Sequence, residues 1–185
     1  MNKINLGISA CLVGQKTRYD GADKLDRFLV EALSEFVEFV PVCPEVECGL
    51  GVPREAMHLI GHVNALRLVT IQTGVDMTSR MEQWASRRVK ELESVRQLAD
   101  KQRLRGFVFK ANSPSCGVGR VPVYSSKGAE PVCEGVGLFA RMLMERFPAL
   151  PVEEDERLHD PKILDDFIQR LFAAARRTSP NTPGR

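Results

Sequence analysis

Short apolar runs that stop abruptly in polar turns recur along this chain. Residues 4–8, 37–42 and 107–111 are such runs, and Ser, Pro, Gly or Cys follows each of them within a few positions. Runs of this length and composition predict buried strands. A similar run at residues 66–71 predicts one more strand within the irregular stretch 43–74.

Between the predicted strands, apolar side chains recur three and four positions apart, which predicts amphipathic helices. One helix starts near Ala22, and the longest starts at a capping box formed by Ser79 and Glu82. Gly135-Val136-Gly137 opens another helix, and Asp160-Pro161 supplies the N-cap and the first-turn proline of the last one. The predicted apolar faces are Leu25, Phe28, Leu29, Ala32, Leu33 and Phe36; Met81, Trp84, Ala85, Val89, Leu92, Val95 and Ala99; Leu138, Phe139, Met142 and Leu143; and Ile163, Leu164, Phe167, Ile168, Leu171 and Phe172.

Two features between these elements carry weaker signals. Gly and Pro punctuate residues 118–131, which predicts a hairpin or a lid. His58 and His62 have the spacing of two ligands on one helix face, but Gly61 lies between them and nothing caps such a helix. We therefore interpret them as surface or loop histidines.

The order of elements predicts an α/β fold. Strand 4–8, the first helix and strand 37–42 form a β-α-β unit with parallel strands and a right-handed crossover. We expect a Rossmann-like three-layer sandwich around a mostly parallel sheet of about four to five strands. The 185 residues suffice for a single domain, over residues 1–177, with residues 178–185 as a flexible tail.

The charge balance and the cysteine content set the expected partners and compartment. Lys and Arg number 26 against 24 Asp and Glu, and this formal net charge of +2 disfavours nucleic acid as a partner without excluding it. No stretch approaches the roughly 20 apolar residues of a membrane span, so we expect no membrane contact. Five cysteines without a secretory signal predict a reducing, cytoplasmic compartment. The composition leaves the oligomeric state open.

Three cysteines follow predicted strands and are candidate metal ligands. Cys11, Cys43 and Cys116 are 32 and 73 positions apart, so only the fold brings them together. Parallel strands of an open sheet collect ligands at their C-terminal edge, where we expect all three thiols. Three thiolates leave one iron of a 4Fe-4S cluster without a protein ligand, and a substrate can bind there.

Other interpretations of the cysteines remain open at this point. Free cysteines are often buried as small apolar residues, which we expect for Cys133. Cys48 follows Cys43 at a metal-ligand spacing and would convert the site into a closed four-cysteine centre. A zinc hydrolase or deaminase using Cys43, Cys48 and Cys116 with Glu45 as base is one alternative, although the His-x-Glu signature of zinc deaminases is missing. A non-catalytic metal-storage or electron-carrier protein is another.

The motifs around these cysteines resemble those of the thiouracil desulfurase family, catalogued as a domain of unknown function, DUF523. The resemblance spans roughly residues 4–148. The residues that carry it are Ser9-Ala10-Cys11-Leu12, Arg18-Tyr19-Asp20-Gly21, Val42-Cys43-Pro44-Glu45-Val46, Gly49-Leu50, Pro53-Arg54, Lys110 and Ser113-Pro114-Ser115-Cys116-Gly117.

This resemblance implies a 4Fe-4S-dependent enzyme that removes sulfur from a thiolated pyrimidine such as 2-thiouracil, giving uracil and sulfide without a net redox change. Cys11, Cys43 and Cys116 would hold the cluster, and the substrate sulfur would bind its open iron. Glu45 and Ser113 would be the catalytic side chains. Glu45 suits a general base that activates water, and Ser113 suits a group that holds the substrate or the water.

Charged residues near the motifs are expected to support the site. We expect Arg18 and Lys110 to offset the negative charge of three thiolates, although Arg18 has Asp20 as an alternative partner. Asp20 is the next candidate for the base if Glu45 is not. Ser115 is expected to support the substrate or the cluster.

Simpler roles exist for the same side chains. Glu45 could instead accept backbone hydrogen bonds in the Pro44 turn. Ser113 or Ser115 could instead cap the cysteine turn. Cys48 replaces a glycine of the family pattern, so we expect it beside the site and not as an obligatory ligand.

The expected substrate is small. Relatives that act on thiolated RNA carry an additional C-terminal domain, which we do not expect here, and the near-neutral net charge does not indicate the broad basic surface that RNA favours. We therefore expect a free thiolated base or nucleoside.

Overall fold

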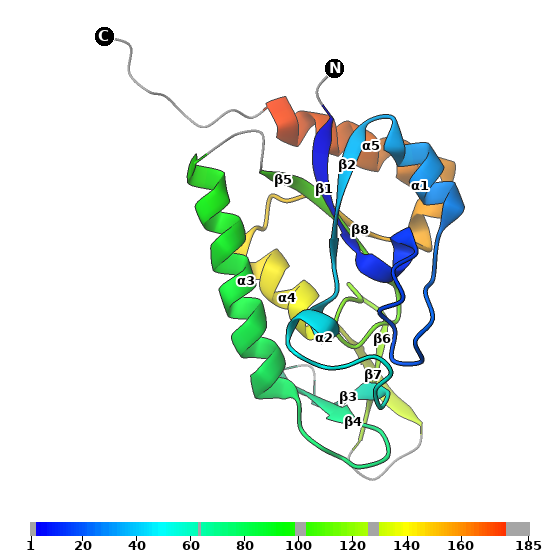
Figure 1. Cartoon of the computed structure of the whole chain (residues 1–185), viewed down its shortest axis with the longest axis vertical. Coiled ribbons are helices and arrows are strands. Elements are labelled where there is room, and N and C mark those ends of the chain that lie inside the picture. Colours follow the sequence, from blue (N-terminus) through cyan, green and yellow to red (C-terminus); the bar gives the residue numbers. More distant parts are fainter. Residues whose placement is uncertain (1–2, 63, 99–102, 126–129, 177–185) are drawn as a thin grey trace.

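The computed structural model describes residues 3–62, 64–98, 103–125 and 130–176. Four strands form a wholly parallel sheet, sheet A, in the order β2-β1-β5-β8 (Figure 1). Their bounds are β1 (Ile4–Ser9), β2 (Val37–Val42), β5 (Leu104–Phe109) and β8 (Val152–Glu154). The parallel sheet is thereby confirmed, whereas β8 was not predicted because two of its three residues are glutamates.

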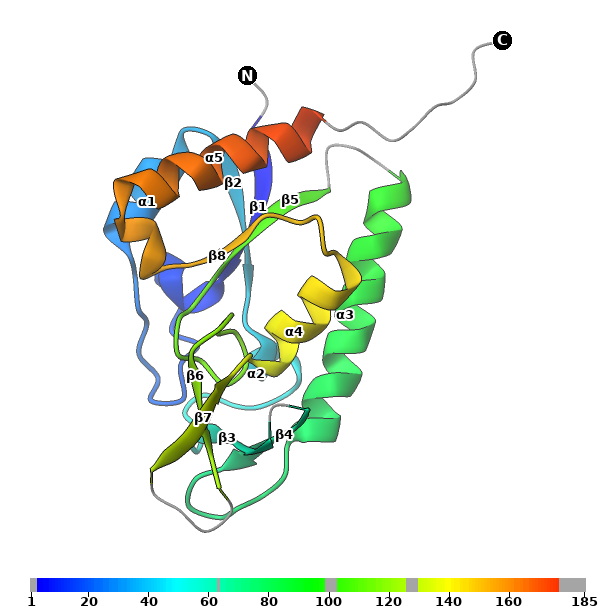
Figure 2. The same cartoon turned by 180° about the vertical axis from the view of Figure 1, so that it is seen from behind.

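Helices cover both faces of sheet A, which confirms the three-layer sandwich (Figures 1 and 2). Strand β5 shows the division: Val108 packs with α1 (Arg27–Ser34) and α5 (Pro161–Arg176) on one face. Phe107 and Phe109 point to the other face and pack with α3 (Thr78–Leu98) and α4 (Leu138–Arg146). The alternation follows from the two-residue period of a strand, so both faces of β5 are apolar.

A second sheet, sheet B, lies beyond the C-terminal ends of β1 and β2 (Figure 1). Its order is β4-β3-β6-β7, with β3 parallel to β6 and the other two pairs antiparallel. The strands are β3 (Met57–His62), β4 (Ala65–Thr70), β6 (Val121–Tyr124) and β7 (Pro131–Gly135). The predicted strand 66–71 and the predicted hairpin are both present.

Of the predicted surface or loop positions, the surface position holds for His62, which is exposed, whereas the loop position was wrong for both histidines. His58 and His62 lie on strand β3, which pairs along its whole length with β4. The ring of His58 stacks on Tyr124, with 5.0 Å between the ring centroids. Contacts with neighbouring strands therefore explain why residues 57–62 form a strand, and the local sequence does not reveal these contacts.

The start of α1 also differs from the prediction. The helix begins at Arg27, and the Asp26 carboxylate caps it by accepting a hydrogen bond from the Leu29 amide (3.1 Å). Leu25 and Phe28, predicted on the apolar face, are 42% and 45% exposed. The residues before Asp26 are instead part of an extended loop that follows η1, a 3-10 helix (Ala10–Val13).

Helix α3 begins one residue before the predicted capping box. The Asp76 carboxylate accepts a hydrogen bond from the Thr78 amide (2.9 Å), so Ser79 lies inside the helix and caps nothing. The predicted stripe of Met81, Trp84, Ala85 and Val89 is buried, and Leu92 is partly buried. The side chain of Val95, together with Ala99 and the predicted tail 178–185, lies outside the described residues.

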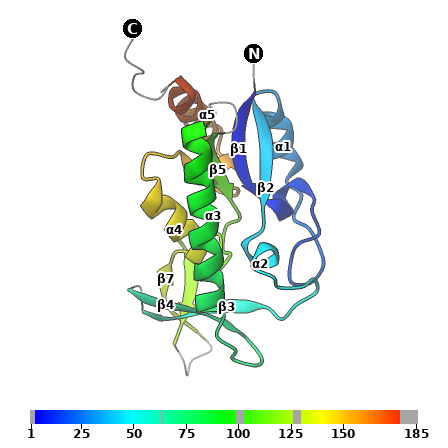
Figure 3. The same cartoon turned by 60° about the vertical axis from the view of Figure 1, so that its left-hand side comes forward.

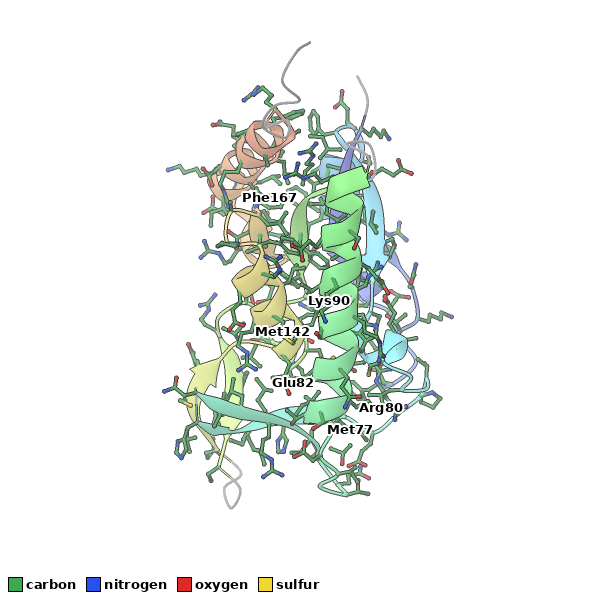
Figure 4. The ribbon with its side chains drawn as sticks, turned by 90° about the vertical axis from the view of Figure 1, so that its left-hand side faces the viewer. Met77, Arg80, Glu82, Lys90, Met142 and Phe167 are labelled. Atoms are coloured by element: carbon green, nitrogen blue, oxygen red, sulfur yellow. The ribbon has the colours of Figure 1, made fainter. Side chains whose placement is uncertain are left out.

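Helices α3 and α4 pack side by side against sheet A (Figures 3 and 4). Trp84 of α3 contacts Phe139 of α4, with 5.1 Å between ring centroids, and Phe139 also packs on Phe107 and Phe109 of β5. None of the described helices is long and apolar enough to cross a membrane.

The first turn of α4 binds the segment that carries Cys116. The amides of Phe139 and Ala140 donate to the Ser115 carbonyl (3.0 and 3.3 Å), and the Gly137 amide donates to the Gly117 carbonyl (2.8 Å). The free N–H groups of a helix start are thus satisfied by the cysteine turn. This close approach requires a glycine at position 137.

We expect Gly137→Ala to destabilise the fold by about 1–3 kcal/mol, the range for overpacking a filled site. An added Cβ would lie 2.5 Å from the Ser115 carbonyl carbon and 2.6 Å from the Cys116 nitrogen, so backbone must move. Urea denaturation measures the loss. Gly119→Ala is the control, because nothing lies within 4 Å of its added Cβ; equal unfolding free energies for the two variants would contradict the expectation.

Candidate active site

A cavity of about 1220 Å³ opens at the C-terminal edge of sheet A. The three predicted ligands, Cys11, Cys43 and Cys116, all contribute to its lining. Glu45 and Arg54 line the same cavity, which therefore brings thiols and ionisable side chains together.

The three cysteines follow strands of sheet A at different numbers of positions along the chain. Cys43 directly follows β2 and is the N-cap residue of α2 (Pro44–Glu47), the short helix between the two sheets in Figure 1. Cys11 lies in η1, two positions after β1, and Cys116 lies in a turn seven positions after β5. The strand-end placement therefore describes Cys43 well, and loops deliver the other two.

Backbone contacts hold each of these turns. The Ser113 hydroxyl accepts a hydrogen bond from the Cys116 amide (3.1 Å), and the Glu47 carboxylate accepts one from the Cys43 amide (3.1 Å). The Cys11 carbonyl accepts one from the Lys24 amide (2.9 Å). The backbone of each of the three cysteines is thus held by hydrogen bonds within the protein.

Burial keeps these thiols protonated. The pKa of Cys11 is raised to about 11, mostly by burial and also by the neighbouring Cys43, while Lys110 and Arg18 oppose the shift. Burial likewise raises the pKa of Cys43, and it raises the pKa of Cys116 well above the ordinary value. A metal centre that binds these residues as thiolates must displace their protons and supply positive charge.

The two remaining cysteines are separate from this group. Cys48 is not among the described residues that line the cavity, and its Sγ donates to the Glu45 carbonyl (3.2 Å). Arg80, labelled in Figure 4, reaches from α3 to the Cys48 carbonyl (2.9 Å) and fixes this segment on the helix. Cys133 packs against the apolar core, as predicted.

A single-ion site is not supported by the geometry. Across residues 3–62, 64–98, 103–125 and 130–176, no group of three or more His, Cys, Asp and Glu side chains is close enough to hold one metal ion. The irons of a cluster are separate atoms, so the cysteines that bind it can lie further apart. Three thiols around one cavity fit a cluster better than the zinc alternative.

The Glu45 carboxylate accepts hydrogen bonds from other side chains and not from the backbone of its own turn. Its Oε2 accepts from Nε of Arg54 (2.8 Å) and from Nη2 of the same guanidinium, and its Oε1 accepts from the Ser115 hydroxyl (2.9 Å). Its side chain is 15% exposed. The carboxylate that accepts a backbone hydrogen bond in this turn belongs to Glu47, so Glu45 remains directed at its own partners in the cavity wall.

The two serines have different positions. The Ser113 hydroxyl caps the cysteine turn by accepting from the Ser115 and Cys116 amides (3.3 and 3.1 Å), and it also lines the cavity. Ser115 is fully buried and donates to Glu45. The turn-capping alternative therefore describes Ser113, which still presents its hydroxyl group to the cavity wall.

The basic residues are paired and still affect the thiols. Arg18 binds both oxygens of Asp20 (3.2 and 3.1 Å), as the alternative interpretation held. Lys110 binds Asp155 (2.7 Å) and Glu156 (3.4 Å). Both cations lower the pKa of Cys11 through their charge. Asp20 is not among the described residues that line the cavity, which makes it a poor second candidate for the base.

Comparisons with known proteins agree with this geometry. The sequence matches the profile of the 2-thiouracil desulfurase family over residues 6–155. The chain belongs to the 2-thiouracil desulfurase family. The resemblance drawn from its motifs is thereby confirmed.

A solved structure is similar to the whole desulfurase fold seen here. It is a [4Fe-4S]-dependent thiouracil desulfidase, TudS, with 28% sequence identity and a TM-score of 0.66, and the match covers 89% of this chain and 99% of that chain. None of the curated proteins matches the sequence.

Two residues that contact the site had no role in the sequence-based hypothesis. Arg54 belonged to a family motif, yet its partner Glu45 is nine positions away and only the fold shows the pair. Asp155 is buried after β8 and accepts from the Ala111 amide (2.7 Å) and from Lys110. It was missed because β8 was missed.

The metal-free desulfurase should lose folding stability as pH rises from about 9 to about 11. Cys11 has its pKa raised from near 9 to about 11 in the folded state. A group with a raised folded-state pKa stabilises the fold fully below the unfolded pKa, and the contribution is lost as pH rises through the folded value. Urea midpoints across this range measure the loss. Cys11→Ala should lose less, and equal losses would contradict this assignment.

Proposed function

We propose that this protein is a 4Fe-4S-dependent desulfurase that removes sulfur from a thiolated pyrimidine such as 2-thiouracil. The products would be uracil and sulfide, with no net redox change. The observation that carries the proposal is the cavity shared by Cys11, Cys43, Cys116 and the Glu45 carboxylate. Family membership and the similarity to a [4Fe-4S]-dependent thiouracil desulfidase support it.

The donor set fits a cluster with three protein ligands. Cys11, Cys43 and Cys116 would hold it, and Cys48, whose thiol faces the Glu45 carbonyl, would not. When bound, such a cluster supplies an iron without a protein ligand that accepts a soft thiocarbonyl sulfur and draws electron density from the adjacent carbon. Arg18 and Lys110, whose charges lower the pKa of Cys11, would offset part of the negative charge of the thiolates.

Glu45 would act as general base. Its carboxylate takes a proton from a water molecule, whose oxygen bonds to the carbon that carries sulfur. The carbon–sulfur bond then breaks as the carbon-bound hydroxyl gives up its proton, and this proton and the one held by Glu45 go to the leaving sulfide. One water and one thiocarbonyl thus give one carbonyl and one hydrogen sulfide. Ser113, which lines the cavity, would contact the water or the substrate.

The cavity favours a small substrate. About 1220 Å³ is ample for a cluster together with a base or a nucleoside, given that pockets for small ligands typically measure about 300–1,000 Å³. All five cysteines are free thiols, which is consistent with a reducing, cytoplasmic compartment. Nucleic acid as a substrate remains disfavoured by the net charge of +2.

Glu45→Gln should keep the cluster and lose on the order of a hundredfold or more in rate, the usual scale for acid–base assistance. The amide removes the basic oxygen and keeps the shape of the side chain. Sulfide release from 2-thiouracil and iron content are measured in both proteins after anaerobic purification. Glu31→Gln, on the exposed side of α1, is the matched control and should behave as wild type. Normal turnover by Glu45→Gln would exclude Glu45 as the base.

Cys48→Ala should retain both iron and activity. Its thiol is half-buried and bonded to the Glu45 carbonyl, so its removal leaves the three ligands of the cavity in place. Cys43→Ala serves as the comparison and should lose the cluster. Iron and labile sulfide are determined for both variants. Loss of iron from Cys48→Ala would mean a four-cysteine centre and would end the substrate-on-iron proposal.

A further inference from the structure

Arg54 joins three separate segments of the chain at the cavity. Its guanidinium binds Glu45 through Nε (2.8 Å) and Nη2, the Thr17 carbonyl through Nη2 (2.8 Å), and the Gly51 carbonyl through Nη1 (3.1 Å). Its backbone amide donates to the Tyr19 carbonyl (2.8 Å). The side chain is only 9% exposed, so these bonds are largely shielded from water.

The hydrogen bonds to Glu45 distinguish its two oxygens. Each carboxylate oxygen has two acceptor positions. Oε2 accepts two bonds from Arg54, whereas Oε1 accepts one bond, from the Ser115 hydroxyl. An acceptor position therefore remains on Oε1, and this oxygen is the one that can take a proton from water.

Arg54 also holds the loop between η1 and α1, residues 14–26. Thr17 and Tyr19 of this loop line the cavity; the Arg54 guanidinium donates to the Thr17 carbonyl, and the Arg54 backbone amide donates to the Tyr19 carbonyl. The Thr17 carbonyl also accepts from Sγ of Cys43 (3.8 Å). Arg54 thus connects loop 14–26 with the adjacent Glu45 carboxylate and with the segment that carries Cys43.

We propose that Arg54 is a positioning residue that directs Oε1 of Glu45 into the cavity and fastens loop 14–26 over it. The proposal rests on the proposed function, in which Glu45 is the base, and adds the residue that orients it. Both tasks depend on the planar fork of the guanidinium, in which Nε and Nη2 converge on Oε2 while Nη1 and Nη2 reach the Gly51 and Thr17 carbonyls.

A lysine at this position tests whether the charge of Arg54 or the geometry of its guanidinium matters. Its ammonium keeps the positive charge beside Glu45 but cannot reproduce the fork. We expect Arg54→Lys to lose about tenfold to a hundredfold in kcat with a smaller change in KM and normal iron content, because a misplaced base weakens the transition state. Arg54→Gln should lose at least as much.

A double-variant comparison shows whether Arg54 acts through Glu45. Arg54→Lys is measured in the wild-type and the Glu45→Gln background, with sulfide release from 2-thiouracil and iron content as readouts. Because residues that act as a unit are not additive, Arg54→Lys should cost less than about threefold when Glu45 is already Gln. Equal losses in the two backgrounds would overturn the positioning role.

Limited trypsin digestion tests the loop without any reference to activity. Loop 14–26 contains Lys16, Arg18 and Lys24 as cleavage sites. In both metal-free and cluster-loaded protein, Arg54→Lys should be cleaved there about tenfold or more faster than wild type, as expected when a local opening becomes easier. The matched control is Arg67→Lys on β4, where Arg67 pairs with Asp76 (2.9 Å) on an exposed surface; it should leave loop cleavage unchanged.

The outcomes separate the two proposals. Unchanged loop cleavage in Arg54→Lys would overturn the fastening role. If wild-type protein released no sulfide from any thiolated base or nucleoside, the proposed function would fail, and the digestion would still decide the role of Arg54 in the loop. If Arg54→Gln fails to fold, Arg54→Lys and Glu45→Gln remain; the latter weakens the same contact from the other side and should also speed loop cleavage.

Discussion

The packing of the cysteine turn on the first turn of α4 is the constraint on which the site depends. Backbone amides of α4 donate to carbonyls of residues 115 and 117, and Gly137 leaves space for that approach. The helix is in turn fixed by Phe139, which packs on two phenylalanines of β5. The apolar core therefore fixes α4, and backbone hydrogen bonds from α4 fix the turn that carries Cys116.

A second constraint is electrostatic. The cavity gathers three thiols and several carboxylates, and burial raises the pKa of each thiol. Arg54 forms an ion pair with Glu45, whereas the charges of Arg18 and Lys110 lower the pKa of Cys11. Lys110 is itself fixed by Asp155, which also binds the Ala111 amide at the start of the loop that leads to Cys116. Charge compensation and loop geometry are thus provided by the same residues.

The comparison of sequence and structure shows where periodicity is informative. Strands β1 and β5 are buried on both faces, and the edge strand β2 is still mostly apolar, so all three were predicted well, as was the helical stripe of α3. Strand β8 and strand β3 were not predicted, because glutamates, histidines and a glycine interrupt their apolar pattern. Strand β8 owes its structure to pairing with β5, which is distant in sequence, whereas β3 pairs along its whole length with the neighbouring β4.

The sequence by itself determined the α/β class, the strands that lead to the cysteines and the motifs that identify the three candidate ligands with Glu45. These depend on local composition and on short spacings, which a single chain displays directly. The tertiary structure alone decided that Cys48 lies outside the cavity lining, that Ser113 caps a turn while Ser115 binds Glu45, and that Arg54 holds both that carboxylate and the neighbouring loop. Those contacts join segments up to 70 positions apart, and the hydrogen-bond partner of a side chain at that separation is set by the packing of whole elements.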